Sequence, residues 1–311
     1  MCGGLGVSAW RSQATQLRCA AVIKLDAATV LLQWAVGGMA FCWFTTRRRQ
    51  VGLGYGWLLR GIYLLLAIGA AITGFRYGDV PVREASSIAV AATCLFALAV
   101  SIVHRRAGVS GSESEHNRRS ERVAEMTGIE RGQPDRSAGL TDREFPPIVD
   151  LFPVVVGIVG LVAAGIDAAP ETGFDTFVSL LRILAGAAFL GAVTDAMLLG
   201  HWYLVQPGLP RRLLNELVSA LGWTWPIEVV AMLLPTGMFS VWSGTVDDGW
   251  DGVLGWFWGA CAVTTIVLVF VTRAALKERQ YSAVMAATGL LYLAILTAFG
   301  TDLVARAVLD V

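Results

Sequence analysis

Charge is scarce in this chain. Only 15% of its 311 residues are charged and 55% are apolar, whereas soluble domains carry roughly 25% charge. A water-soluble fold could not bury that much apolar surface, so a soluble domain is excluded. The formal net charge is zero, which excludes an overall electrostatic attraction to nucleic acid.

Cysteine and the common catalytic motifs are also sparse or missing. The five cysteines show no C-x-x-C spacing, which argues against a zinc site or a disulfide framework. No Walker A loop, H-E-x-x-H motif or dinucleotide-binding glycine pattern occurs, so the nucleotide-binding and metalloprotease classes that depend on these motifs are excluded. No metal site is predicted.

The chain does contain long apolar runs. Each is close to the 20 or so residues that a helix needs to cross a bilayer, and none alternates with period 2 as an outer-membrane strand would. They predict an all-α, polytopic transmembrane bundle of about eight spanning helices. The runs are approximately Ala27–Thr46, Trp57–Phe75, Ala85–His104, Pro147–Asp167, Thr176–His201, Leu213–Val241, Trp250–Thr272 and Tyr281–Val304.

Basic residues collect in alternate connections. Arginines follow the first and third runs and precede the sixth, while residues 167–175 and 243–249 contain no Lys or Arg. Because cytoplasmic loops carry the basic excess, both termini are predicted to be extracytoplasmic, in a plasma (inner) membrane protein. The N-terminal arm, residues 1–25, argues mildly against this, since it holds Arg11, Arg18 and Lys24.

A polar stretch divides the predicted helices into three (26–104) and five (147–311). Residues 105–146 mix many arginines, acids, serines and glycines with few apolar clusters, so they cannot bury enough surface to fold alone. They are interpreted as a flexible cytoplasmic linker. The alternative is a regulatory loop that docks other membrane subunits or cytoplasmic partners.

The sixth run contains a helix-breaking sequence. Pro226 lacks a backbone donor and disfavours helical geometry at Trp225, so the run is either one kinked helix or a surface helix over residues 211–221 followed by a shorter span. The surface helix is the favoured interpretation, with its leucines against lipid. Glu228 would then lie in the first turn of the spanning helix, where the dipole favours an anion.

Two histidines end predicted spans at a similar depth. His104 closes the third run and His201 the fifth, and two imidazoles at one depth are suited to ligate haem b or to line a quinone headgroup pocket, with Trp202 and Tyr203 beside the second. The alternative is that both are interfacial residues among headgroups, as expected for His201 beside two aromatic residues.

Asp195 is the strongest candidate for a catalytic acid. It lies inside the fifth run, where a bare carboxylate costs several kcal/mol, so it must be protonated, paired or wet. It is six residues from His201, too far around the helix to bond it. Arg182, Asp302 and Arg306 lie near helix ends and are expected to reach the interface instead.

Three functions remain open. The first is a membrane redox or quinone-linked component, in which the histidines contact haem or quinone and Asp195 assists proton movement. The second is a secondary transporter that uses Asp195 and the break at Pro226. The third is a non-catalytic subunit whose linker docks a partner.

Overall fold

The computed structural model describes residues 26–78, 80–107, 144–169, 173–206, 208–278 and 280–309, and all regular structure in these ranges is helical. Eight of the helices are long and apolar enough to cross a membrane, which confirms the predicted bundle. These are α2 (Ala27–Thr46), α3 (Leu53–Tyr77), α4 (Pro81–Val103), α6 (Leu151–Asp167, preceded by the 3-10 turn η3, Pro147–Asp150), α7 (Phe174–Val205), α8 (Arg211–Leu233), α10 (Val253–Lys277) and α11 (Tyr281–Leu309). The N-terminal arm and most of the linker, residues 108–143, lie outside the described residues.

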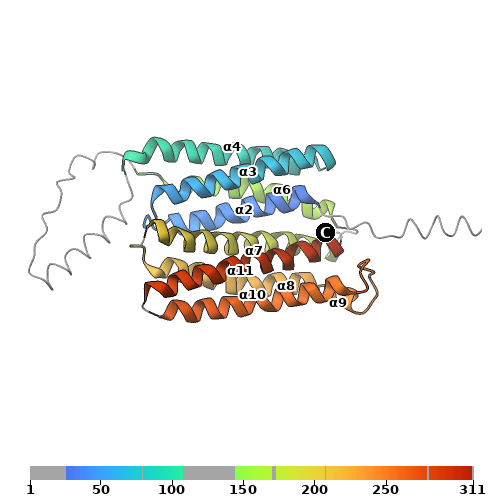
Figure 1. Ribbon diagram of the computed structural model, residues 1–311. Helices are drawn as coiled ribbons and strands as arrows, with labels where there is room; N and C mark the ends of the chain where they lie inside the picture. The colour runs from blue at the N-terminus through green and yellow to red at the C-terminus, as the bar shows by residue number, and fades with distance from the viewer. Residues whose placement is uncertain are drawn as a thin grey trace, which may run out of the picture.

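The helices alternate in direction, so their connections lie at the two ends of the bundle (Figure 1). The two ends carry different charged residues. We call one end the basic face; it carries Arg47, Arg48, Arg49, Arg211 and Arg212. We call the other the acidic face; it carries Asp26, Asp247, Asp248 and Asp251. The connections from α2 to α3 and from α7 to α8 lie at the basic face, whereas the short helix α9 (Gly237–Trp242) lies at the acidic face.

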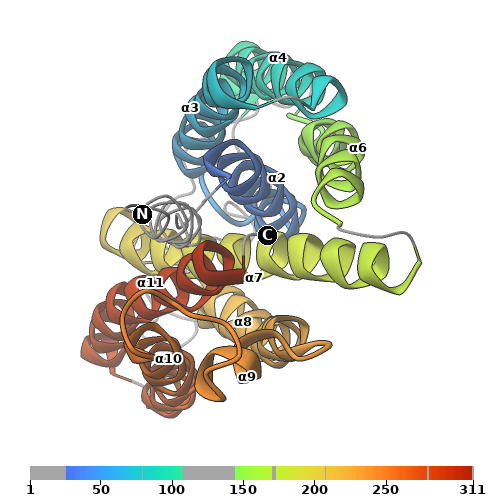
Figure 2. The ribbon, with the colours of Figure 1, turned by 90° about the vertical axis from the view of Figure 1, so that its right-hand side faces the viewer.

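In space the eight helices form two groups of four. The first half consists of α2, α3, α4 and α6, and the second half of α7, α8, α10 and α11; within each half every helix packs against two others of that half. Figure 2 shows the two halves on either side of the contact between α2 and α7. The linker divides the sequence three plus five, but α6 packs on α2 and α4 and so completes the first half.

Glycines allow α2 and α7 to approach closely. A Cβ atom added at Gly37 would overlap the backbone carbonyl of Ala187, and one added at Gly191 would overlap the backbone of Gly37. Small residues permit this kind of backbone contact between membrane helices, where van der Waals packing replaces the hydrophobic effect as the driving force. The α2–α7 contact is therefore the joint between the two halves.

The sixth span differs from the favoured prediction of a surface helix over residues 211–221. Helix α8 is continuous from Arg211 to Leu233 with Pro226 inside it, and Leu214, Leu217 and Leu221 are buried in the protein core, not placed against lipid. The residue before the proline is anchored to a neighbouring helix, since the Trp225 indole donates to the carbonyl of Ala262 on α10. Tertiary packing therefore overrides the local tendency to break.

The loop that precedes α10 is held by Asp248. Burial opposes ionisation of this carboxyl, but hydrogen bonds from the amides of Gly252, Trp250 and Leu254 outweigh burial and lower its pKa below the usual value. A depressed pKa means that the loop is stabilised at every pH above the ordinary value of about 3.9 and loses this stability as the pH falls through the folded-state value.

Asp248→Asn is accordingly expected to increase hydrogen exchange in residues 247–254 at pH 7. The same variant should match the unmodified protein at strongly acidic pH, where protonation of Asp248 leaves neither protein with a charge at this position. Equal exchange of the two proteins at pH 7 would contradict this role.

Candidate functional site

Asp195 is bound by a tyrosine from the other half of the protein. Its side chain is fully buried on α7, and the hydroxyl of Tyr63 on α3 donates to Oδ1. The hydroxyl of Tyr55 donates to the main-chain oxygen of Asp195 at 3.4 Å, while no donor from the described part of the chain reaches Oδ2. Tyr63 is thus the inter-helix partner that an aspartate in this position requires and that sequence reasoning did not name.

The space for the Tyr63 ring comes from a glycine at the joint. A Cβ atom on Gly38 would overlap the Tyr63 ring, so the tyrosine reaches Asp195 across α2 only because this position has no side chain. Trp34 on α2 also bonds across the joint, since its indole donates to the Thr194 hydroxyl at 2.9 Å. The joint between the halves therefore contains two polar contacts, from Tyr63 to Asp195 and from Trp34 to Thr194, as well as close glycine packing.

The structure does not bring the two candidate histidines together. His104 ends α4, and its Nδ1 lies 2.8 Å from the carbonyl of Val100 on the same helix. His201 on α7 is exposed, and its Nδ1 lies 3.3 Å from the hydroxyl of Tyr292 on α11. Helices α4 and α11 lie on opposite sides of α2 in Figure 2.

The two aromatic neighbours of His201 serve the structure of the basic face. Trp202 packs against Tyr55 and its indole lies 3.3 Å from the Gln206 side chain. Tyr203 is buried, and its hydroxyl donates to the carbonyl of Pro210 at 2.7 Å. Both side chains tie the end of α7 to adjacent loops, and neither shares a contact with His104 among the described residues.

A buried ion pair lies near the basic face. Arg60 on α3 donates through Nε and Nη2 to the two carboxylate oxygens of Asp150, both at 2.7 Å, and both side chains are at most 1% exposed. Ser101 accepts from Arg60 at 3.0 Å and Thr46 donates to Asp150 at 3.2 Å. Arg60 lies inside the predicted run Trp57–Phe75, but its partner Asp150 is 90 positions away in the 3-10 turn η3, so the pair could not be predicted from the sequence.

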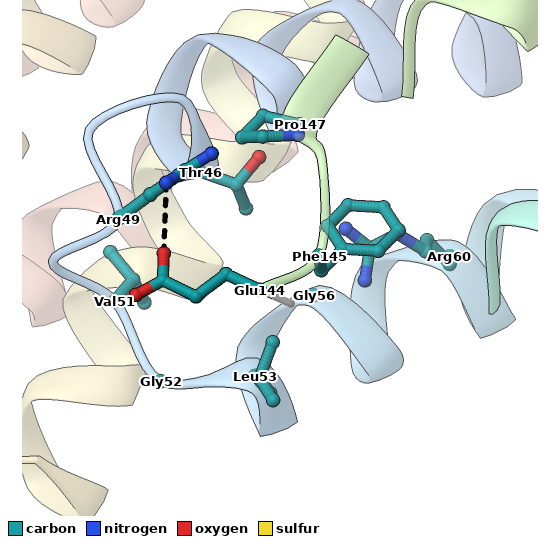
Figure 3. Close-up of a pocket in the computed structure, with 10 residues that line it drawn as sticks. All are labelled: Thr46, Arg49, Val51, Gly52, Leu53, Gly56, Arg60, Glu144, Phe145 and Pro147. Carbon is teal, nitrogen blue, oxygen red and sulfur yellow. Dashed lines mark hydrogen bonds and ion pairs between the residues drawn. The ribbon is translucent and has the colours of Figure 1, made fainter. Parts of the chain in front are cut away.

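A small cavity opens beside this pair (Figure 3). Its volume is about 30 Å³, which is enough to hold water. The Phe145 ring lies over the Arg60 guanidinium, 4.3 Å from its centroid, and Arg49 pairs with Glu144 at 2.9 Å. This geometry encloses the Arg60 guanidinium, whose side chain is 1% exposed.

A second group of buried polar side chains lies toward the acidic face, and we call this group the acidic-end cluster. Its members come from α2, α7, α8 and α11, and each is at most 8% exposed. Three of them, which were expected to reach the interface, are instead inside the protein, and Glu228 lies in the later part of continuous α8 and not in a first turn. The members are Gln33, Arg182, Glu228, Asp302 and Arg306.

Hydrogen bonds within the cluster explain why its charges stay inside. Arg306 donates to Asp302 at 2.9 Å and to the main-chain oxygen of Arg182 at 2.8 Å. The amide of Gln33 donates to the carbonyl of Ile183 at 2.6 Å. Buried charges are tolerated in a membrane when they pair with one another and with backbone carbonyls. In the sequence, the only indication of this pairing was the i,i+4 spacing of Asp302 and Arg306.

Comparison of the chain with protein-family models, with curated proteins and with solved structures finds no match. The described residues place buried carboxyl, hydroxyl and guanidinium groups inside a membrane bundle. Asp195 combines full burial, a hydrogen bond from the opposite half and one oxygen without a donor. These properties make it the centre of the candidate site.

Proposed function

We propose that this protein is a proton-coupled secondary transporter in which Asp195 carries the coupling proton. The observation that carries the proposal is the bond between Tyr63 of the first half and Asp195 of the second. Many transporters consist of two helical groups that rock against each other around a site at their interface. A titratable side chain bonded across such an interface is suited to sense and control that movement.

The charge on Asp195 determines how costly separation of the halves is. When the carboxylate is ionised, the Tyr63 hydroxyl stabilises it, and breaking that bond would leave a buried charge without a donor. When a proton from water binds the carboxylate, the group is neutral and the two halves can separate at lower cost. Release of the same proton to water on the other side would complete the cycle.

Redox or quinone chemistry is less well supported. Haem ligation by His104 and His201 needs both imidazoles on one iron, yet their bonds go to different helices on opposite sides of α2. His201 alone faces outward beside Tyr292, which suits a headgroup or interfacial contact. A partner-docking role of the linker remains the alternative for residues 105–146.

We further propose that the basic face is cytoplasmic and that the protein resides in the plasma (inner) membrane. The arginines that follow α2 and those that begin α8 support this orientation through the positive-inside rule. A cysteine introduced at Ser112, in a variant without the native cysteines, should react with an impermeant reagent only from the cytoplasm. Labelling from outside would reverse the assignment.

The test of transport uses purified protein in liposomes that contain a pH-sensitive dye. Amino acids, carboxylates, sugars, phosphate and amines are offered in turn under a proton gradient, and at least one class should drive proton movement. Asp195→Asn should abolish that movement, because the residue then cannot release a proton, whereas Tyr63→Phe should reduce it by about tenfold, the equivalent of one hydrogen bond to a charged group.

Asp175→Asn is the matched control, since this carboxylate lies in the first turn of α7 at the acidic face and should leave transport unchanged. Undiminished transport by Asp195→Asn would contradict the proposal. An absorption band of haem in the purified protein, lost in His104→Ala and His201→Ala, would instead favour the redox function.

A further inference from the structure

The acidic-end cluster contains two acids that face each other without a donor between them. Glu228 on α8 interacts with Asp302 on α11 at hydrogen-bonding range, yet neither oxygen of Glu228 nor Oδ2 of Asp302 receives a hydrogen from any described residue. Both side chains are fully buried. Two ionised carboxylates at this range could only repel each other.

The arginines of the cluster do not supply the missing donor. Arg306 uses Nε for Oδ1 of Asp302 and Nη2 for the main-chain oxygen of Arg182. Its Nη1 is buried and reaches no acceptor among the described residues, so it bonds neither Glu228 nor Oδ2 of Asp302. Arg182 uses Nε for the carbonyl of Ala231 and Nη2 for that of Leu234. These two carbonyls lie at the C-terminal end of α8, where the helix dipole is negative, so Arg182 is stabilised without a carboxylate.

The remaining surroundings contain no other charged partner among the described residues. Gln33 is the contribution of α2 and is neutral, and α10, which packs on α8 and α11, has no charged side chain before Arg273 near its far end. The charged groups that act on Glu228 are Asp302, Arg306 and Arg182. One proton placed between the two acids removes the repulsion between them, satisfies two of the three oxygens and leaves a single negative charge beside Arg306.

We propose that Glu228 and Asp302 share one proton, with Glu228 as the neutral acid that donates to Asp302 while Asp302 keeps its ion pair with Arg306. The pair is a second proton-binding site, separate from Asp195 and nearer the acidic face. Its existence does not require transport. Its use as the place where protons enter or leave the protein rests on the proposed function.

The asymmetry between the two acids provides the first test. Glutamine at 228 resembles the neutral acid and its amide can donate to Asp302, so Glu228→Gln should change the apparent Tm in detergent by no more than about 2 °C. Asparagine at 302 removes the partner of a buried guanidinium, so Asp302→Asn should lower the Tm by roughly 6–20 °C. Equal destabilisation, or the reverse order, would overturn the assignment of the proton to Glu228.

Infrared spectroscopy provides the second test and does not depend on stability. At neutral pH the protein in nanodiscs should show a carbonyl stretching band of a protonated carboxyl group that disappears in Glu228→Gln and persists in Asp195→Asn. Glu216→Gln, on the same helix but in an ion pair with Arg212, should leave the band intact. A band unaffected by Glu228→Gln would overturn the proposal.

The outcomes separate this inference from the transporter assignment. If Asp195→Asn leaves transport unchanged while Glu228→Gln removes the band, the shared proton stands and the proposed function fails. If the band survives Glu228→Gln while Asp195→Asn abolishes transport, the proposed function stands and the second site does not exist.

Discussion

Gly37→Leu is expected to prevent the two halves from assembling. A side chain at position 37 would occupy the space of the Ala187 carbonyl on α7, and this obstacle is backbone, which cannot rotate away as a side chain can. Overpacking a tight core commonly costs about 1–3 kcal/mol and occasionally more. Here both helices would have to move apart, so we expect a loss at or above the top of that range.

The measurement is size-exclusion chromatography of the fluorescently tagged protein, combined with thiol-reactive dye labelling on heating. Cys42, Cys94 and Cys261 are buried free thiols, so they report the opening of the bundle. Gly37→Leu should label at a much lower temperature than the unmodified protein or should aggregate.

A matched glycine control lies on α3. An added Cβ at Gly61 meets nothing within 4 Å, and a leucine there would extend outward from the helix. Gly61→Leu should therefore elute and label like the unmodified protein. Normal assembly of Gly37→Leu would show that the α2–α7 contact is not the joint that close backbone packing indicates.

Asp150→Ala is expected to produce the second large loss of stability. It leaves the Arg60 guanidinium buried without its carboxylate, and removal of one partner of a buried ion pair typically costs about 3–5 kcal/mol. The apparent Tm in detergent should fall by roughly 6–20 °C. Arg212→Ala is the control: its pair with Glu216 is 70% exposed on the arginine side, so the loss should stay below about 1 kcal/mol.

A double replacement distinguishes the cost of an unpaired buried charge from the loss of side-chain packing at the Arg60–Asp150 pair. Arg60→Met combined with Asp150→Leu removes both charges together, so we expect it to be more stable than Asp150→Ala alone, because no unpaired charge remains. If the double variant is as unstable as the single one, the fit of these side chains is what matters, and the charge pairing is not.

The bundle was predictable from the sequence because lipid imposes strict length and composition on a spanning helix. The run Ala27–Thr46 coincides with α2, and the others differ from their helices by a few residues at the ends. The exception is the sixth. There the local effect of Pro226 suggested a break, but buried leucines and the bond from Trp225 to α10 hold one continuous helix.

The site was only partly predictable, since partners on other helices depend on how helices rotate and pack. Burial of Asp195 inside a span signalled a polar partner, but nothing in the sequence placed Tyr63, 132 residues earlier, against it. The sequence predicted that His104 and His201 end their runs, but it did not show on which side of the bundle each residue lies. Similarly, Arg182 and Arg306 were expected to reach the interface because the sequence does not show which helices pack around them.

The Arg60–Asp150 pair has a consequence for biosynthesis. The two residues are 90 positions apart, so at about 5–20 residues per second the ribosome delivers Asp150 roughly 5–18 s after Arg60. During that interval α3 carries an arginine with no carboxylate partner, and its side chain must extend toward the headgroups until α6 enters the membrane. Completion of the first half therefore waits for the segment beyond the linker, and a chain truncated before Asp150 should be a substrate for membrane quality control.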